Sequence, residues 1–116
     1  MPKLSADQGR VYFYRVDALT GGGLTAPVKL DGVVVGESVP GAYFFVDVAP
    51  GKYEASAATR VTRKFSFVLE AGETRYVRTK AQFEEKVGRV VLESVSAEEA
   101  RRELPALNFT GTAKAN

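Results

Sequence analysis

Short stretches of β-branched and aromatic residues recur along the chain, and several alternate apolar with polar positions. The stretches with this pattern are residues 10–16, 27–30, 33–36, 43–48, 52–59, 63–69, 74–83 and 88–95. A two-residue period points successive side chains to opposite faces of a sheet, and turn residues bound most of these stretches. The pattern therefore predicts an all-β chain.

Turn residues separate these predicted strands. The phrase Pro40-Gly41-Ala42-Tyr43 is repeated ten residues later as Pro50-Gly51-Lys52-Tyr53. Pro presets the first central φ of a type II turn and Gly supplies the positive φ that follows, so both phrases predict such a turn before a strand. Asp31-Gly32 lies between two apolar runs and predicts a type I′ hairpin. A lone Asp31 without the Asp/Asn spacing of a calcium loop is a turn residue in this interpretation.

Periodicity also predicts which side chains face inward. Residues 43–48 are apolar on both parities, which is typical of a central strand covered on both faces, with Asp47 at solvent or a turn amide. The inward set of the later strands is Tyr53, Ala55, Ala57, Phe65, Phe67, Leu69, Arg75 (near the rim), Val77, Thr79 and Ala81. If residues 63–69 and 74–83 form a hairpin, Phe67 opposes Val77 or Arg75, because paired residues share a face.

The C-terminal part of the chain predicts one short helix. Ser96-Ala97-Glu98-Glu99 matches a capping box, and Pro105 stops the helix near Leu104. A narrow apolar stripe suits docking on the sheet; it consists of Ala97, Ala100, Leu104 and Leu107. The expectation is a single β-sandwich of about seven strands with one C-terminal helix. It spans residues 9–107, with flexible termini at 1–8 and 108–116.

Composition excludes several kinds of chemistry. The chain has 116 residues, no His and no Cys, so it cannot build a Ser-His-Asp or Cys-His centre, a disulfide or a typical structural zinc site. A net charge of +2 is far from the basic footprint of a nucleic-acid-binding domain. No apolar stretch approaches the roughly 20 residues that cross a bilayer. We expect no cofactor, no metal and no nucleic-acid partner.

The sequence offers two candidate working surfaces. In the expected register Lys64, Arg78 and Lys80 share an outward face, which could meet an anionic partner such as a lipid headgroup, a polysaccharide phosphate or an acidic protein. The alternative is a solvated face whose Lys side chains deter edge-to-edge pairing. The second surface is the loop around Gly21–Gly23, where no Gly-Lys-Ser/Thr follows to indicate a phosphate-binding loop.

Asp and Glu residues are scattered along the chain, and no two of them indicate a catalytic cleft. We therefore expect no catalytic residues and no enzyme.

Four segments resemble a bacterial family, the domain-of-unknown-function 2846 family. They are Gly9–Arg15, Leu30-Asp31-Gly32, Pro40–Val46 and Glu70–Arg78. The resemblance runs from about Gly9 to Leu107 with the motifs in order. The phrase at Pro50–Tyr53 is also similar to one in transthyretin-like (prealbumin-like) and carboxypeptidase-regulatory-like sandwiches, so a transthyretin-like fold is expected.

The resemblance implies a location. Many members of the family look like lipoproteins, so it implies a Gram-negative envelope protein tethered at the outer membrane and facing the periplasm, through an N-terminal lipid anchor that this chain lacks. Met1 either is the native start or follows a removed signal. The expected function is a non-enzymatic binding or scaffolding domain whose partner is an envelope protein or an anionic envelope surface. The alternatives are a small hydrolase acting on envelope carbohydrate and a cytoplasmic adaptor domain.

Overall fold

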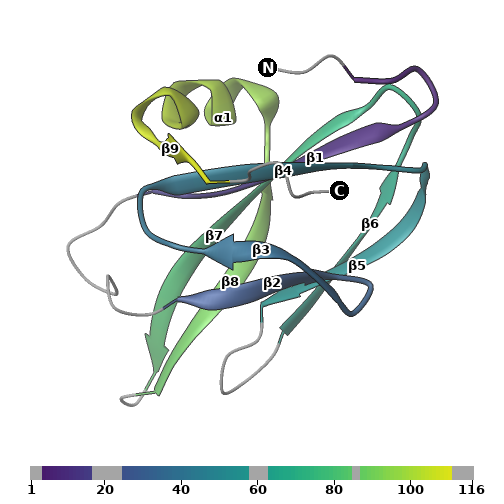
Figure 1. Cartoon of the computed structure of the whole chain (residues 1–116). Coiled ribbons are helices and arrows are strands. Elements are labelled where there is room, and N and C mark those ends of the chain that lie inside the picture. The colour runs from purple at the N-terminus through teal and green to yellow at the C-terminus, as the bar shows by residue number, and fades with distance from the viewer. Residues whose placement is uncertain (1–3, 17–24, 58–62, 85–86, 111–116) are drawn as a thin grey trace.

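The computed structural model describes residues 4–16, 25–57, 63–84 and 87–110 (Figure 1). The elements in chain order are β1 (Gly9–Arg15), β2 (Ala26–Leu30), β3 (Val33–Ser38), β4 (Ala42–Val48), β5 (Gly51–Ala57), β6 (Arg63–Leu69), β7 (Thr74–Glu84), β8 (Val87–Val95), α1 (Ala97–Glu103), the 3-10 helix η1 (Leu104–Ala106) and β9 (Asn108–Phe109). The predicted all-β class with one short C-terminal helix is confirmed.

The strands form two sheets packed face to face. Sheet A has the order β8-β7-β1-β4-β9, and sheet B has the order β3-β2-β5-β6. Strand β1 pairs antiparallel with β4 and parallel with β7, so the N-terminal strand is central in sheet A. The described residues form nine strands where about seven were expected. The transthyretin-like topology stays a prediction.

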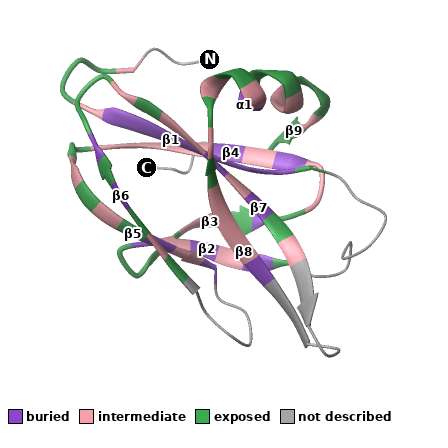
Figure 2. Ribbon diagram, turned by 180° about the vertical axis from the view of Figure 1, so that it is seen from behind, coloured by how far each residue is buried: buried purple, intermediate pink, exposed green. Residues whose placement is uncertain are grey.

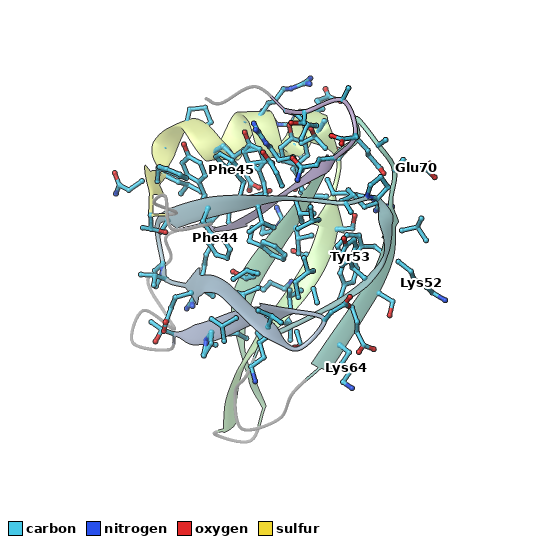
Figure 3. The ribbon with its side chains drawn as sticks, turned by 45° about the vertical axis from the view of Figure 1, so that its right-hand side comes forward. Phe44, Phe45, Lys52, Tyr53, Lys64 and Glu70 are labelled. Carbon is cyan, nitrogen blue, oxygen red and sulfur yellow. The ribbon has the colours of Figure 1, made fainter. Side chains whose placement is uncertain are left out.

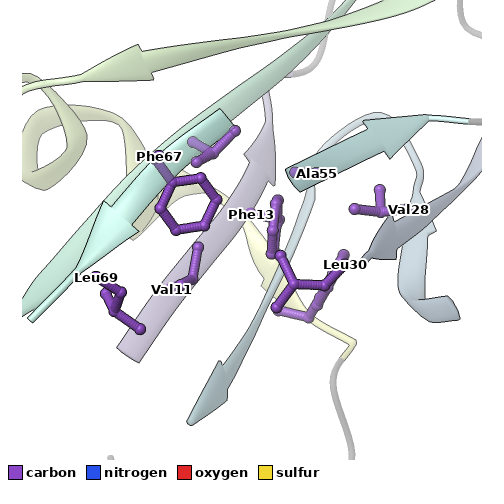
Figure 4. Close-up of a cluster of buried hydrophobic side chains, with 9 residues drawn as sticks. Val11, Phe13, Val28, Leu30, Ala55, Phe67 and Leu69 are labelled. Atoms are coloured by element: carbon purple, nitrogen blue, oxygen red, sulfur yellow. The ribbon is translucent and has the colours of Figure 1, made fainter. Parts of the chain in front are cut away.

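The hydrophobic core lies between the two sheets (Figure 4). Its buried members are Val11, Phe13, Val28, Leu30, Phe44, Ala55, Phe67, Leu69 and Val77. They come from both sheets and from alternate positions of their strands, because successive strand residues face opposite ways. The inward set predicted for β5, β6 and β7 is confirmed: Ala55, Phe67 and Val77 are buried, and Tyr53 and Phe65 pack against them.

Two of the three predicted turns are confirmed. Asp31 and Gly32 have φ of 52° and 83°, the double positive φ of a type I′ hairpin. Gly41 has φ of 75°, and the Ala42 amide donates to the carbonyl of Val39 at 3.2 Å, as a type II turn requires. The second Pro-Gly turn is wrong. Gly51 has φ of 155° and is already the first residue of β5.

The predicted hairpin between residues 63–69 and 74–83 is also wrong. Strand β6 pairs with β5 in sheet B, where Phe67 lies opposite Tyr53. Strand β7 pairs with β1 and β8 in sheet A. The link after Leu69 therefore crosses from one sheet to the other. Periodicity gave the inward faces correctly because a two-residue period fixes which side is buried but says nothing of the neighbouring strand.

A flexible terminus was expected to begin at residue 108. The structure instead continues in an ordered strand there. Asn108 and Phe109 form β9, and the amides of Asn108 and Thr110 donate to the carbonyls of Gly41 and Tyr43, each at 2.9 Å. The loop around Gly21–Gly23 lies outside the described residues. No helix among the described residues has the length and apolarity needed to cross a membrane.

Candidate functional site on the outer face of sheet A

The outer face of sheet A carries the candidate site. Because Val11 and Phe13 of β1 point into the core, Tyr12 and Tyr14 point outward. Helix α1 lies over this face, as both ribbon views show (Figures 1 and 2). The helix starts as predicted, with the amide of Glu99 donating to the Ser96 side chain at 3.1 Å.

Helix α1 is held on the sheet by charged side chains as well as by the apolar stripe that was predicted to dock it. Of that stripe, Ala100 is fully buried. The stronger contacts come from Arg78 of β7, whose Nη1 donates to Glu99 at 2.7 Å and to Glu103 at 3.0 Å, while its Nε donates to Glu93 of β8 at 2.8 Å. With the hydroxyl of Tyr14, which donates to Glu103 at 2.6 Å, these residues are the Arg78 cluster.

Carboxylates dominate the charge of this cluster. Burial alone would lower the pKa of Arg78, but hydrogen bonds to Glu99, Glu93 and Glu103 outweigh it and raise the pKa above its ordinary value. One guanidinium is thus surrounded by three carboxylates. The Arg78 guanidinium therefore already has carboxylate partners within the chain.

The structure does not bring the predicted basic face together. Lys64 lies on β6 at the outer face of sheet B, 3.7 Å from a carboxylate oxygen of Glu54. Arg78 and Lys80 lie on β7 in sheet A, and Lys80 is 3.7 Å from Glu93. Figure 3 shows Lys64 near the start of β6, on the side of the molecule away from α1. The three cations were placed on one face because β6 and β7 were expected to pair, and they do not.

A feature that the sequence prediction missed lies beside the Arg78 cluster. Neighbouring strands β7, β1 and β4 present Tyr76, Tyr12 and Tyr43 to the same side, with ring centroids 5.2 Å apart for Tyr12 and Tyr76 and 6.2 Å apart for Tyr12 and Tyr43. Arg101 of α1 and Leu104 and Pro105 of η1 complete the lining of a hollow of about 270 Å³. We call this site the tyrosine hollow.

The aromatic surface continues past the hollow toward the edge of the sheet. The Phe45 ring lies 5.4 Å from Tyr12 and 5.6 Å from Phe109 of β9, and Phe109 is 48% exposed. Next to it, Arg10 forms a two-point salt bridge with Asp47 at 2.7 and 3.0 Å, and its guanidinium lies 4.3 Å from the Phe45 ring centre. Asp47 therefore pairs with an arginine, whereas solvent or a turn amide was expected.

Sequence carried part of the signal for this face. Tyr12, Tyr43, Phe45 and Tyr76 all stand on the outward parity of their strands, where a solvated sheet would place polar side chains. What the sequence did not reveal is that β7, β1 and β4 are neighbours, and that the chain after β8 returns over them. Only that arrangement turns separate rings into one surface.

A second polar cluster is enclosed inside the sandwich. Arg15, only 3% exposed, donates to the carbonyl and hydroxyl oxygens of Ser38 at 3.3 Å, and the Ser38 and Thr79 hydroxyls are 2.8 Å apart. Burial lowers the pKa of Arg15. The space beside these groups has no room for a water molecule, so the cluster is part of the packed interior.

The described carboxylates do not form a recognisable hydrolytic pair. Those that converge do so around Arg78, where all three accept hydrogen bonds from its guanidinium. A glycosidase needs one carboxyl group held protonated as the acid and another free as base or nucleophile. The described residues also contain no group of His, Cys, Asp or Glu that could hold a metal ion. What this face presents instead is a group of aromatic rings around one hollow.

One of the comparisons with known proteins identifies the family. The chain is similar to an uncharacterized protein of Haemophilus influenzae, at 28% identity over 100 residues, which is 85% of this chain. The aligned part spans 59% of that relative's length. No solved structure matches the chain. The model of the family described as Protein of unknown function (DUF2846) matches residues 5–90. The chain belongs to the DUF2846 family.

Proposed function

We propose that this chain is a non-enzymatic binding domain of a bacterial cell-envelope lipoprotein, and that it binds an envelope protein through the outer face of sheet A. The observation that carries the proposal is the tyrosine hollow together with the exposed ring of Phe109. Aromatic rings held by a rigid sheet provide contact area at little cost in conformational entropy. A contiguous patch of exposed apolar rings often marks an interaction site, whereas a single exposed apolar residue does not.

The position of this surface supports binding by a preformed site. Tyr12 is 9% exposed and forms its floor, so it is held by Tyr76, Tyr43 and Phe45 around it. The helix-borne wall is fixed by the Arg78 cluster. A surface whose side chains are already ordered loses less entropy when a partner binds.

Site-specific photocrosslinking in cells tests this function. The full-length protein of the source bacterium carries p-benzoylphenylalanine at Phe109, or at Ser66 on the outer face of sheet B as the matched control. We expect a crosslinked product with an envelope protein from position 109 and none from position 66. Equal products from both positions, or none from either, would overturn the proposal.

Two alternatives predict different results in companion experiments. A cytoplasmic adaptor predicts that the full-length protein fractionates with cytosolic markers, whereas the proposal places it with outer-membrane markers. A hydrolase of envelope carbohydrate predicts new reducing ends when the protein is incubated with purified envelope glycans. We expect no increase over a blank without protein.

A further inference from the structure

The tyrosine hollow is a small, open site, large enough for one aromatic ring. Its volume of about 270 Å³ lies below the range of about 300–1,000 Å³ that holds drug-sized molecules. Tyr rings form its floor and one side, and Leu104 and Pro105 form the other. An aromatic ring can pack against the Tyr rings and against Leu104 and Pro105.

Arg101 at this hollow differs from its neighbours in having no carboxylate partner within the described residues. Four other arginines are paired with carboxylates: Arg10 with Asp47, Arg75 with Glu73, Arg78 with three glutamates and Arg102 with Glu98. A guanidinium presents a fork of donors that matches a carboxylate. The guanidinium donors of Arg101 are thus available to bind a carboxylate at the hollow.

Arg101 carries the only charge among the described residues that line the hollow. None of these six lining residues is acidic. Of the acidic residues on this face of sheet A, Glu99 and Glu103 bind Arg78 and Asp47 binds Arg10. An incoming carboxylate therefore meets an arginine whose charge is not offset by an ion pair in the described part of the chain.

We propose that the tyrosine hollow binds the C-terminal aromatic residue of a partner protein, with the ring against Tyr12, Tyr43 and Tyr76 and the terminal carboxylate on Arg101. This inference rests on the proposed function and names the part of the partner that is bound. A C-terminal Phe or Tyr carries a ring and a carboxylate on one residue, which matches a small aromatic hollow with one cation in its lining. An internal aromatic residue beside an Asp would need a second side chain to reach Arg101.

N-acetylphenylalanine is the minimal probe, and N-acetylphenylalaninamide and N-acetylalanine are its matched controls. Binding is followed by NMR chemical-shift changes in the protein and by tyrosine fluorescence, which is readable because the chain has no Trp. We expect the free acid to shift the Tyr12, Tyr43 and Tyr76 signals. Its affinity should be at least tenfold higher than that of the amide or of the alanine analogue.

Two variants in the last turn of α1 separate a binding role from a structural one. Arg101→Gln should weaken binding of the free acid about tenfold and leave binding of the amide unchanged. Arg102→Gln, exposed in the same turn but paired with Glu98 at 3.7 Å, should change neither by more than about twofold. Equal binding of acid and amide, or equal effects of the two variants, would overturn the inference.

A pair of longer probes tests the source of the carboxylate. A hexapeptide ending in Phe with a free carboxylate should bind at least as well as N-acetylphenylalanine. A peptide with an internal Phe-Asp and an amidated end should bind no better than the amide, and tighter binding would overturn the choice of a C-terminus.

The crosslinking and binding experiments together separate this inference from the proposed function. If position 109 crosslinks a partner but no probe binds, the proposed function stands and this inference fails. If neither occurs, both fail.

Discussion

The hydroxyl of Tyr14 donates a 2.6 Å hydrogen bond to Glu103 although 89 residues separate them in the chain. Tyr14 is 2% exposed and belongs to the central strand of sheet A, while Glu103 is the last residue of α1. The bond joins the N-terminal strand to the C-terminal helix. Since Arg101, Leu104 and Pro105 lie on this part of the chain, the same contact helps to set one wall of the tyrosine hollow.

This contact predicts a pH dependence of stability above neutrality. Burial and the hydrogen bond to Glu103 raise the pKa of Tyr14 above the value of 10.0 that an unfolded chain gives it. The folded state therefore holds the Tyr14 proton more tightly, so this contribution is complete below pH 10 and is lost as the pH rises through the folded pKa. In an NMR titration, the Cζ signal of Tyr14 should still be that of the protonated ring at pH 10.5.

Tyr14→Phe is the matched control for that titration. It removes one hydrogen bond, so it should lower the free energy of unfolding by about 1 kcal/mol at pH 7. Because the variant cannot lose the proton, the difference from the wild type should shrink above pH 10. A Tyr14 signal that titrates with a midpoint near 10, or a constant difference between the proteins, would contradict the prediction.

Removal of the cation in the Arg78 cluster should destabilise the fold strongly. Arg78→Gln leaves Glu93, Glu99 and Glu103 close together, with only Lys80, 3.7 Å from Glu93, to offset their charge. Breaking a fully buried ion pair costs about 3–5 kcal/mol, and the 22% exposure of the Arg78 side chain reduces this, so we expect a loss of about 2–3 kcal/mol. Urea unfolding followed by circular dichroism measures it.

Arg102→Gln on α1 is the control for Arg78→Gln on β7. Its salt bridge with Glu98 is 3.7 Å long and both side chains are more than two-thirds exposed, so its loss should change stability by no more than about 0.5 kcal/mol. Similar losses for the two variants would mean that the Arg78 cluster does not hold α1 in place.

The salt bridge between Arg10 and Asp47 gives a third prediction. The Arg10 side chain is 7% exposed, so Asp47→Ala leaves a nearly buried guanidinium without its carboxylate, at a cost of about 2–3 kcal/mol. For a domain of this size that corresponds to a fall in melting temperature of very roughly 10 °C, which calorimetry detects. The exposed pair of Glu54 and Lys64 serves as the control, and Lys64→Ala should leave the melting temperature within about 3 °C. Equal shifts would contradict the assignment.

Sequence was sufficient wherever a local rule determines the structure. The Asp31-Gly32 hairpin follows from the positive φ that both turn positions need, and the start of α1 follows from the Ser96 cap. The buried faces of β5, β6 and β7 follow from their two-residue period. Each of these features depends on residues close together in the chain.

Features that depend on distant residues could not be predicted in the same way. Nothing local distinguishes a link that turns back within a sheet from one that crosses to the other sheet, so Lys64 was grouped with Arg78. An arginine on an outward parity looks like a solvated charge until Glu93, Glu99 and Glu103 are placed around it. The candidate site follows the same rule, because it joins rings from three strands to a helix near the end of the chain.

Close packing at Gly36 gives the last prediction. Gly36 lies opposite Val28, and a Cβ added to it would come within 2.5 Å of the Phe44 ring, which is 3% exposed and stacked with Phe13. The ring must therefore move for Gly36→Ala to fold, and we expect a loss of about 1–3 kcal/mol by urea unfolding. Val34→Ala, at a 57% exposed position of the same strand, should cost far less.

A double-mutant cycle shows whether the Phe44 ring is the cause of that loss. Phe44→Leu gives back part of the space, so combining it with Gly36→Ala should cost at least about 0.5 kcal/mol less than the sum of the single changes. Purely additive losses would mean that Gly36 is required for a reason other than the Phe44 ring. The cycle is informative because both residues lie on the sheet faces that enclose the core, away from the tyrosine hollow. Binding of N-acetylphenylalanine should therefore stay unchanged in every folded member of the cycle.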